Sequence, residues 1–186
     1  MALLIAILVI VILIGIYVMM YNGLVQYKVH AQESWSQIDV QLQRRNDLIP
    51  NLISTVKGYS KYESSTLEKV TQLRTAITNV PADDHAQKME VSNQLSGTLK
   101  TLFAVSENYP DLKASAEYQQ LMEELSNTEN KIAYSRQLYN STVAALNAKI
   151  QSFPSNLVAK MHHFTQMEYL QVPETAKETP KVSFDD

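Results

Sequence analysis

Four charged residues fall at positions where the helical pattern of this sequence otherwise places apolar side chains. They are Arg45, Glu63, Glu129 and Arg136. A charge in an apolar seam must find an opposite charge or remain unfavourably desolvated, so such residues select one helix register and oligomeric state. Because two of the four are basic and two acidic, we predict that they pair within a helical bundle. The alternative is that the seam is shifted by one position and that they face solvent.

Other residues with reactive side chains lack the spacing that chemistry requires. His162 and His163 are adjacent, so on a helix they diverge by about 100° and cannot meet one metal as residues i and i+4 do. Acidic pairs such as Asp83 and Asp84 suit helix caps or solvated faces. The chain has no Cys and none of the phosphate-loop, zinc-hydrolase or serine-nucleophile motifs. We therefore predict no enzymatic activity, no cofactor and no metal site.

The composition favours helices. The 186 residues include only 4 Gly and 6 Pro, and apolar and polar residues do not alternate over long stretches, which disfavours sheets. The net charge of −3 without a basic cluster also disfavours nucleic-acid binding, because phosphates must be matched by many Lys and Arg side chains.

The N-terminal region is expected to cross a membrane. Ala2 through Met20 form an apolar run close to the length of about 20 residues that spans the hydrocarbon core. A secretory signal would need a basic start and a small-residue cleavage site, which are missing. We predict a transmembrane anchor at residues 1–21, with Tyr17 and Tyr21 in the interfacial zone. Lys28 alone favours a cytoplasmic location for the C-terminal side.

The following residues show a seven-residue period typical of coiled coils and bundles. This predicts helices over 22–80, 84–107 and 113–153, a short amphipathic helix over 157–170 and an extended tail at 171–186, within a helical domain at 22–170. Pro50 cannot donate to the carbonyl of Asn46, but the pattern keeps its phase there, so we predict a kink, either static or a hinge. Asp47 could accept hydrogen bonds from donors freed at that kink. The expected fold is all-α: a transmembrane helix continuing into a long-helix antiparallel bundle with coiled-coil character.

The predicted helix lengths do not match. At about 1.5 Å per residue the three long helices span about 88, 36 and 61 Å. If they run up, down and up, residues 22–50 have no partner within the chain, although their seam is apolar. An exposed apolar stripe is most simply covered by neighbouring copies. We therefore predict a homo-oligomer through a seam that includes Leu24, Ala31, Trp35, Ile38 and Leu42.

Several segments resemble the LemA family over about residues 20–170. In the N-terminal half they are Tyr21–Val25, Trp35–Leu52, Val56–Tyr59 and Glu63; in the C-terminal half they are Tyr109–Lys113, Leu121, Glu124, Leu125, Thr128–Ala133, Arg136, Tyr139, Asn140, Asn147 and Phe153–Asn156. The resemblance implies a bacterial single-pass protein of the cytoplasmic membrane with a helical domain and no established enzymatic activity. It assigns these residues structural or interaction roles.

Two functions are compatible with these observations. The first is a structural protein that self-associates through its long helices to scaffold or remodel the membrane, with lipid and further copies of itself as partners. The second is a regulatory adaptor that binds another membrane protein, such as a protease.

Overall fold

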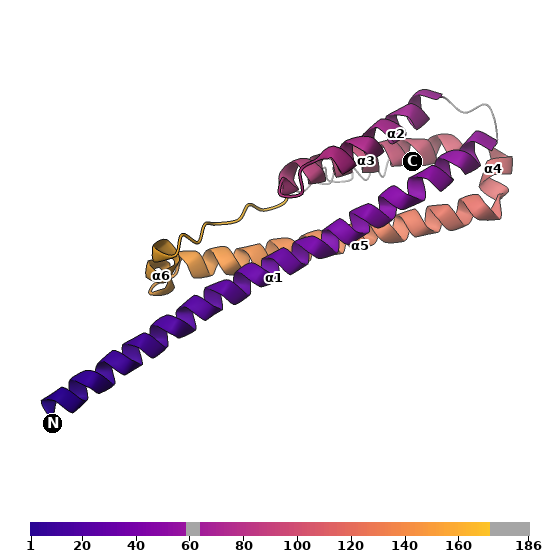
Figure 1. Ribbon diagram of the computed structural model, residues 1–186. Helices are drawn as coiled ribbons and strands as arrows, with labels where there is room; N and C mark the ends of the chain where they lie inside the picture. The colour runs from indigo at the N-terminus through magenta and orange to yellow at the C-terminus, as the bar shows by residue number, and fades with distance from the viewer. Residues whose placement is uncertain (59–63, 172–186) are drawn as a thin grey trace, which may run out of the picture. The chain divides into compact units, whose positions relative to one another are not determined.

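The computed structural model describes residues 1–58 and 64–171 (Figure 1). These residues form helices and no strands, which confirms the all-α prediction. The helices are α1 (Ala2–Gly58), α2 (Ser64–Asn79), α3 (His85–Ser106), α4 (Pro110–Ala114), α5 (Ala116–Gln151) and α6 (Ser155–Met161). The predicted tail falls mostly outside the described residues.

The chain divides into two compact units. Unit 1 comprises Met1–Val40 with Ile132–Tyr169, and unit 2 comprises Gln41–Lys131 together with the chain after Tyr169. The long helices α1 and α5 each contribute residues to both units. We describe each unit by itself.

Unit 2 contains helices whose ends follow from local sequence. Asp84 is the N-cap of α3 and its side chain accepts a hydrogen bond of 2.9 Å from the backbone N–H of Gln87, so one of the two predicted capping aspartates is confirmed. Pro110 occupies the first turn of α4, where no intrahelical N–H is needed. Ser115 is extended and separates α4 from α5.

The core of unit 2 is built from apolar faces of α1, α2, α3, α4 and α5. α2 and α3 are joined by the short segment at 80–84 (Figure 1). The buried residues are Ile49, Leu52, Val56, Leu67, Val70, Leu73, Ile77, Leu95, Leu99, Leu102, Leu112, Tyr118 and Leu125.

One predicted element is wrong. Residues 22–80 do not form a single helix, because α1 ends at Gly58 and α2 begins at Ser64. The seam residues Val70 and Ile77 of α2 nevertheless pack in the same core as Ile49 and Val56 of α1. The periodic pattern thus marks the buried face of two helices that share a core, and it carries no information on whether the chain continues straight between them.

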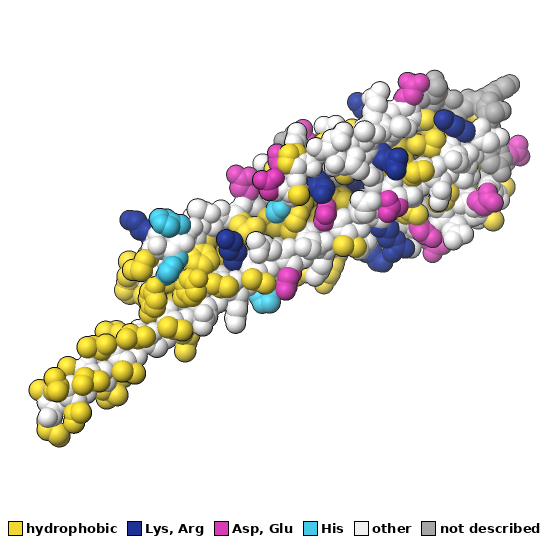
Figure 2. Space-filling model, in the orientation of Figure 1, with side chains coloured by type: hydrophobic (Ala, Val, Ile, Leu, Met, Phe, Trp, Pro, Cys, Tyr) yellow, Lys and Arg dark blue, Asp and Glu magenta, His cyan; other side chains and the backbone are white. Residues whose placement is uncertain are grey.

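Unit 1 contains the first part of α1, the end of α5, and α6. The N-terminal residues of α1 are apolar and exposed: one window of 18 residues has a mean hydropathy of 3.3 and is 0% buried. Figure 2 shows these hydrophobic side chains uncovered along the visible face. The helix then continues without a break into buried positions of unit 1, such as Leu24 and Ala31.

The seam that was predicted to lie between copies is buried within the chain. Leu24, Ala31, Trp35 and Ile38 are buried in unit 1, and Leu42 is buried in unit 2. In unit 1, α6 covers Leu24, and the ring of Trp35 packs edge to face on Tyr139 of α5 at 5.9 Å. The length argument failed because it placed the turn after residue 80, whereas α1 ends at residue 58.

The predicted helix over 157–170 is also wrong in extent. α6 runs from Ser155 to Met161, and His163 adopts a φ of 55°. A residue in this left-handed conformation ends a helix, and the N–H of Phe164 bonds back to the carbonyl of Ala159 at 2.9 Å, as in a Schellman turn. The chain after α6 therefore does not continue along the helix axis.

Candidate functional site

A buried arginine lies at the centre of unit 2. Arg45 of α1 is only 1% exposed. Its Nη1 donates to Glu129 Oε2 of α5 at 2.9 Å and to Ser96 Oγ of α3 at 2.8 Å, while its Nη2 donates to Ser92 Oγ at 2.7 Å. Three helices thus meet at one guanidinium group, and we call Arg45, Ser92, Ser96 and Glu129 the arginine cluster.

The two charged partners of this cluster differ in their exposure to water. Burial lowers the pKa of Arg45, and the nearby Glu129 carboxylate opposes that shift. The guanidinium stays charged, because arginine has a pKa far above neutrality. The Glu129 side chain is 44% exposed and so retains contact with water, whereas Arg45 does not. The cluster is therefore suited to fixing the register of three helices, because a shifted register would leave the buried charge unpaired.

Of the four charges predicted in the seam, Arg45 and Glu129 are paired in this cluster. Glu63 lies outside the described residues. Arg136 is half-buried on α5 in unit 1. Sequence reasoning missed Ser92 and Ser96, which are spaced i and i+4 on α3 and give that helix a polar site facing Arg45. Their spacing was visible, but nothing in the sequence connected them with Arg45, which precedes them by 47 and 51 positions.

At the predicted kink, a side chain from another helix donates a hydrogen bond to the backbone of α1. α1 continues as a helix through Pro50 to Gly58, and the carbonyl of Asn46, which Pro50 cannot reach with an N–H, instead accepts a hydrogen bond of 3.2 Å from Nε of Arg74 on α2. Asp47 accepts from the side chain of Gln43 at 2.8 Å. Arg74 was not predicted, although the vacant carbonyl at Asn46 was a signal that some donor was needed.

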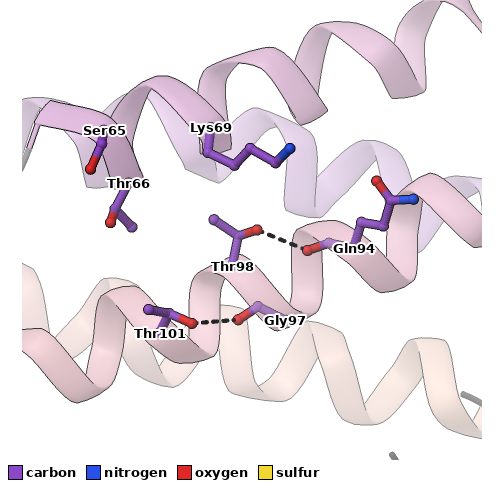
Figure 3. A pocket seen from close by; sticks show the side chains of 7 residues that line it. All are labelled: Ser65, Thr66, Lys69, Gln94, Gly97, Thr98 and Thr101. Carbon is purple, nitrogen blue, oxygen red and sulfur yellow. Dashed lines mark hydrogen bonds between the residues drawn. The ribbon is translucent and has the colours of Figure 1, made fainter. Parts of the chain in front are cut away.

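A groove of about 530 Å³ lies between α2 and α3 (Figure 3). The hydroxyls of Thr98 and Thr101 donate to carbonyls of their own helix at 2.9 and 3.2 Å, which leaves Lys69 as the charged group in the lining. The groove is lined by Ser65, Thr66, Lys69, Gln94, Gly97, Thr98 and Thr101. It contains no acid–base pair. Among residues 1–58 and 64–171, no group of three or more His, Asp or Glu side chains is placed to hold a metal ion.

In unit 1, aromatic side chains gather where the apolar part of α1 ends. The hydroxyl of Tyr17 lies 2.5 Å from Nε2 of His162, and the ring of Tyr21 contacts both His162 at 4.7 Å and Phe164 at 6.1 Å. We call Tyr17, Tyr21, His162 and Phe164 the aromatic collar. The left-handed turn at His163 is what directs Phe164 back toward α1.

Comparisons with known proteins agree with this architecture. The profile of the LemA family matches residues 34–184. The chain is 32% identical over 151 residues to Protein LemA of Metamycoplasma hominis, covering 79% of this chain and 68% of that protein.

More distant similarity extends to proteins with another name. Magnetosome protein MamQ 1 of Paramagnetospirillum magneticum is 26% identical over 96% of this chain and 74% of its own length. Magnetosome protein MamQ of Magnetospirillum gryphiswaldense is 25% identical over 89% of this chain and 69% of its own length.

The family profile covers most of the chain from residue 34 on, and the exposed apolar segment of α1 precedes that part in the same helix. The chain is a membrane-anchored member of the LemA family.

Proposed function

We propose that this protein is a non-catalytic structural protein of the bacterial cytoplasmic membrane, which organises the bilayer by holding a helical domain rigidly against it. One observation carries the proposal. The exposed apolar segment of α1 and the buried residues Leu24, Ala31 and Trp35 of unit 1 belong to one unbroken helix.

An unbroken helix couples two environments in a way that a flexible linker cannot. A Gly/Ser-rich linker would let unit 1 diffuse freely about the anchor, whereas a continuous helix fixes both the tilt and the rotation of unit 1 relative to the anchor. Such coupling is useful to a protein whose task is mechanical. It brings no advantage to an enzyme that only needs to remain at the surface.

Self-association remains part of the proposal, but through a different surface of the protein. The seam at Leu24, Ala31, Trp35, Ile38 and Leu42 is occupied by the chain's own helices, so we withdraw it as the contact between copies. We propose instead that copies meet through surfaces in or beside the bilayer. The relatives named magnetosome proteins support a membrane-associated role.

Insertions in α1 test the coupling. A Gly/Ser heptad inserted after Asn22 makes the joint flexible, and an Ala-rich heptad inserted at the same place keeps it helical and in phase. We expect full-length protein in vesicles to change their curvature or to cluster laterally in electron cryomicroscopy, and the helical insertion to retain this effect while the flexible one loses it. Equal behaviour of both insertions would contradict the proposal. Cross-linking in intact membranes tests self-association, because recovery of monomer alone would remove that part.

A second function is a regulatory adaptor for another membrane protein. It is favoured by exposed large apolar side chains of unit 1 outside the apolar anchor, among which Val40 on α1 is 63% exposed and Tyr134 on α5 is 69% exposed. A stoichiometric partner recovered with the full-length chain in mild detergent, and lost in Tyr134→Ser but retained in Tyr27→Ser, would support the adaptor.

We also propose that the domain lies on the cytoplasmic side, on the basis of Lys28. Because the chain has no Cys, a cysteine introduced at Tyr134 can be labelled uniquely. A membrane-impermeant maleimide added to intact cells should leave it unmodified, and modification without cell disruption would place the domain outside.

A further inference from the structure

The residue types along α1 indicate where the membrane–water interface crosses unit 1. The apolar run ends at Met20, Tyr17 and Tyr21 occupy the last turns, and the first Lys or Arg is Lys28. Tyr is enriched at the membrane–water interface, and Lys side chains near the end of a span reach toward the headgroups. The interface therefore lies along α1 between about residues 17 and 28, following the aromatic and charged positions.

α6 packs on this same stretch of α1. Val158 and Ala159 are buried against Leu24, with Met20 and Tyr21 packed around them. These contacts, together with the bond between His162 and the Tyr17 hydroxyl in the aromatic collar, place α6 at the height of the interface rather than deep in the aqueous part of the domain.

The other side of α6 is apolar and uncovered. Leu157 is 59% exposed and Met161, one turn later, is 66% exposed; Phe153, in the turn that precedes the helix, is 80% exposed. Exposed apolar side chains of this size, grouped on one short segment, mark an interaction surface. Figure 2 shows hydrophobic side chains over the region of α6 beside those of the anchor.

The charges around α6 have one sign. Residues 1–32 and 132–167 contain no Asp or Glu. Lys160 is exposed on α6 between Leu157 and Met161, Lys149 lies one turn before Phe153 in the chain, and Nζ of Lys28 lies 5.9 Å from the ring centre of Phe164. Apolar residues interleaved with Lys are typical of segments that lie in the interface of a membrane with anionic lipids.

We infer that α6 and the preceding turn form a membrane foot, in which Phe153, Leu157 and Met161 insert into the headgroup region of the same leaflet that α1 leaves, and Lys160 binds anionic headgroups. The inference rests on the proposed membrane role, and gives unit 1 a second point of attachment to the bilayer. Two attachments also explain how the domain would resist tilting about α1.

Single cysteines with spin labels test the foot, because the natural chain has none. We place the label in turn at Leu157, at Ile10 within the anchor, and at Tyr134, which is exposed on α5. Full-length protein is reconstituted in phosphatidylcholine vesicles with and without phosphatidylglycerol, and relaxation by oxygen and by a water-soluble nickel chelate gives the depth of each label. Circular dichroism verifies that each variant keeps its helices.

The foot predicts that the label at position 157 is several-fold less accessible to nickel than the label at 134. We expect this difference in accessibility to be larger when phosphatidylglycerol is present. Lys160→Glu in the same background should reduce the difference made by phosphatidylglycerol. The foot is overturned if the label at 157 is as accessible to nickel as the label at 134. If the label at 10 is still inaccessible to nickel in that case, the anchor is unaffected. Nickel access at position 10 as well would overturn the anchored role itself.

Discussion

The two units bury the same helix by different means. In unit 1, α1 presents Trp35 to Tyr139 in an edge-to-face contact, with the hydroxyls of Ser34 and Thr142 3.3 Å apart beside it. In unit 2, α1 presents the charge of Arg45 to Glu129 and to serines of a third helix. At Trp35 the packing in unit 1 thus depends mainly on the fit of two rings, whereas at Arg45 unit 2 adds to its apolar core a charge with directed hydrogen bonds.

The difference has consequences for how each unit fails. An aromatic contact loses energy gradually as the fit worsens, because many small dispersion contacts contribute to it. A buried guanidinium tolerates little misplacement, because each unpaired donor carries a desolvation cost. Unit 2 should therefore be the more selective in register, and unit 1 the more dependent on side-chain volume.

The largest effect is expected from Trp35→Ala in unit 1. The side chain is buried, and removing a buried aromatic ring costs about 4 kcal/mol of unfolding free energy. Hydrogen exchange on the full-length chain in nanodiscs should show loss of protection over residues 132–151, with a smaller change over 85–106. Trp35→Phe is the matched control, and equal damage by both substitutions would mean that volume is not the controlling property.

In unit 2, the two sides of the ion pair should respond unequally. Glu129→Ala leaves Arg45 buried without its carboxylate and should cost about 3 kcal/mol, near the low end for breaking a buried pair because Glu129 is partly hydrated. Arg45→Met leaves no buried charge behind, only a hydrated carboxylate and two serine hydroxyls, and should cost about 1 kcal/mol less. Denaturant unfolding, monitored through hydrogen exchange of residues 85–106, measures the loss of unfolding free energy in each variant. A larger loss for Arg45→Met than for Glu129→Ala would contradict the unequal burial of the two partners.

A smaller effect is expected at the vacant carbonyl of α1. Arg74→Met removes the donor to Asn46 and should cost about 1 kcal/mol, as for a typical hydrogen bond. In a Pro50→Ala background the helix supplies its own N–H to that carbonyl, so the same change should cost less. A double-mutant cycle detects the difference, and strictly additive costs would show that Arg74 acts independently of Pro50.

The smallest effect concerns alkaline pH. Burial raises the pKa of Tyr118 above its usual value of 10.0, although the hydrogen bond with Ser106 opposes the shift. A raised folded-state pKa stabilises the native state below pH 10, and this contribution falls as pH increases through the folded-state pKa. Burial, followed by the charge of Glu168, likewise raises the pKa of Tyr139 in unit 1.

Phe substitutions separate these two tyrosines. The stability difference between wild type and Tyr118→Phe, followed through residues 85–106, should be constant below pH 10 and shrink above it, while Tyr139→Phe should alter the alkaline response of residues 140–151. Exposed Tyr134→Phe is the control. A difference for Tyr118→Phe that grows with pH would reverse the sign of the shift.

Several parts of the architecture could be read from the sequence because they are encoded locally. The anchor follows from composition, the start of α3 from the capping carboxylate of Asp84, and the end of α5 from Pro154. The buried faces of α1 and α5 follow from period alone, since Leu24, Ile38, Ile132 and Val143 are all buried as the pattern predicts.

The remaining features depend on contacts between distant residues. The break after Gly58 was hidden because the pattern stays in phase on both sides of it; the glycine itself, a frequent residue at helix ends, was the available signal. The serine partners of Arg45 and the donor to Asn46 come from other helices, so they depend on a topology that was predicted incorrectly. The reversal at His163 required a left-handed residue that is not glycine, for which the sequence has no marker.

Because α1 continues without a break from the apolar anchor into unit 1, unit 1 also determines how the anchor is rotated about its own axis. Leu24 and Ala31 face inward in unit 1, so packing in unit 1 fixes the direction in which each side of residues 2–20 faces. Residues 2–20 therefore cannot rotate about the helix axis unless unit 1 rotates with them.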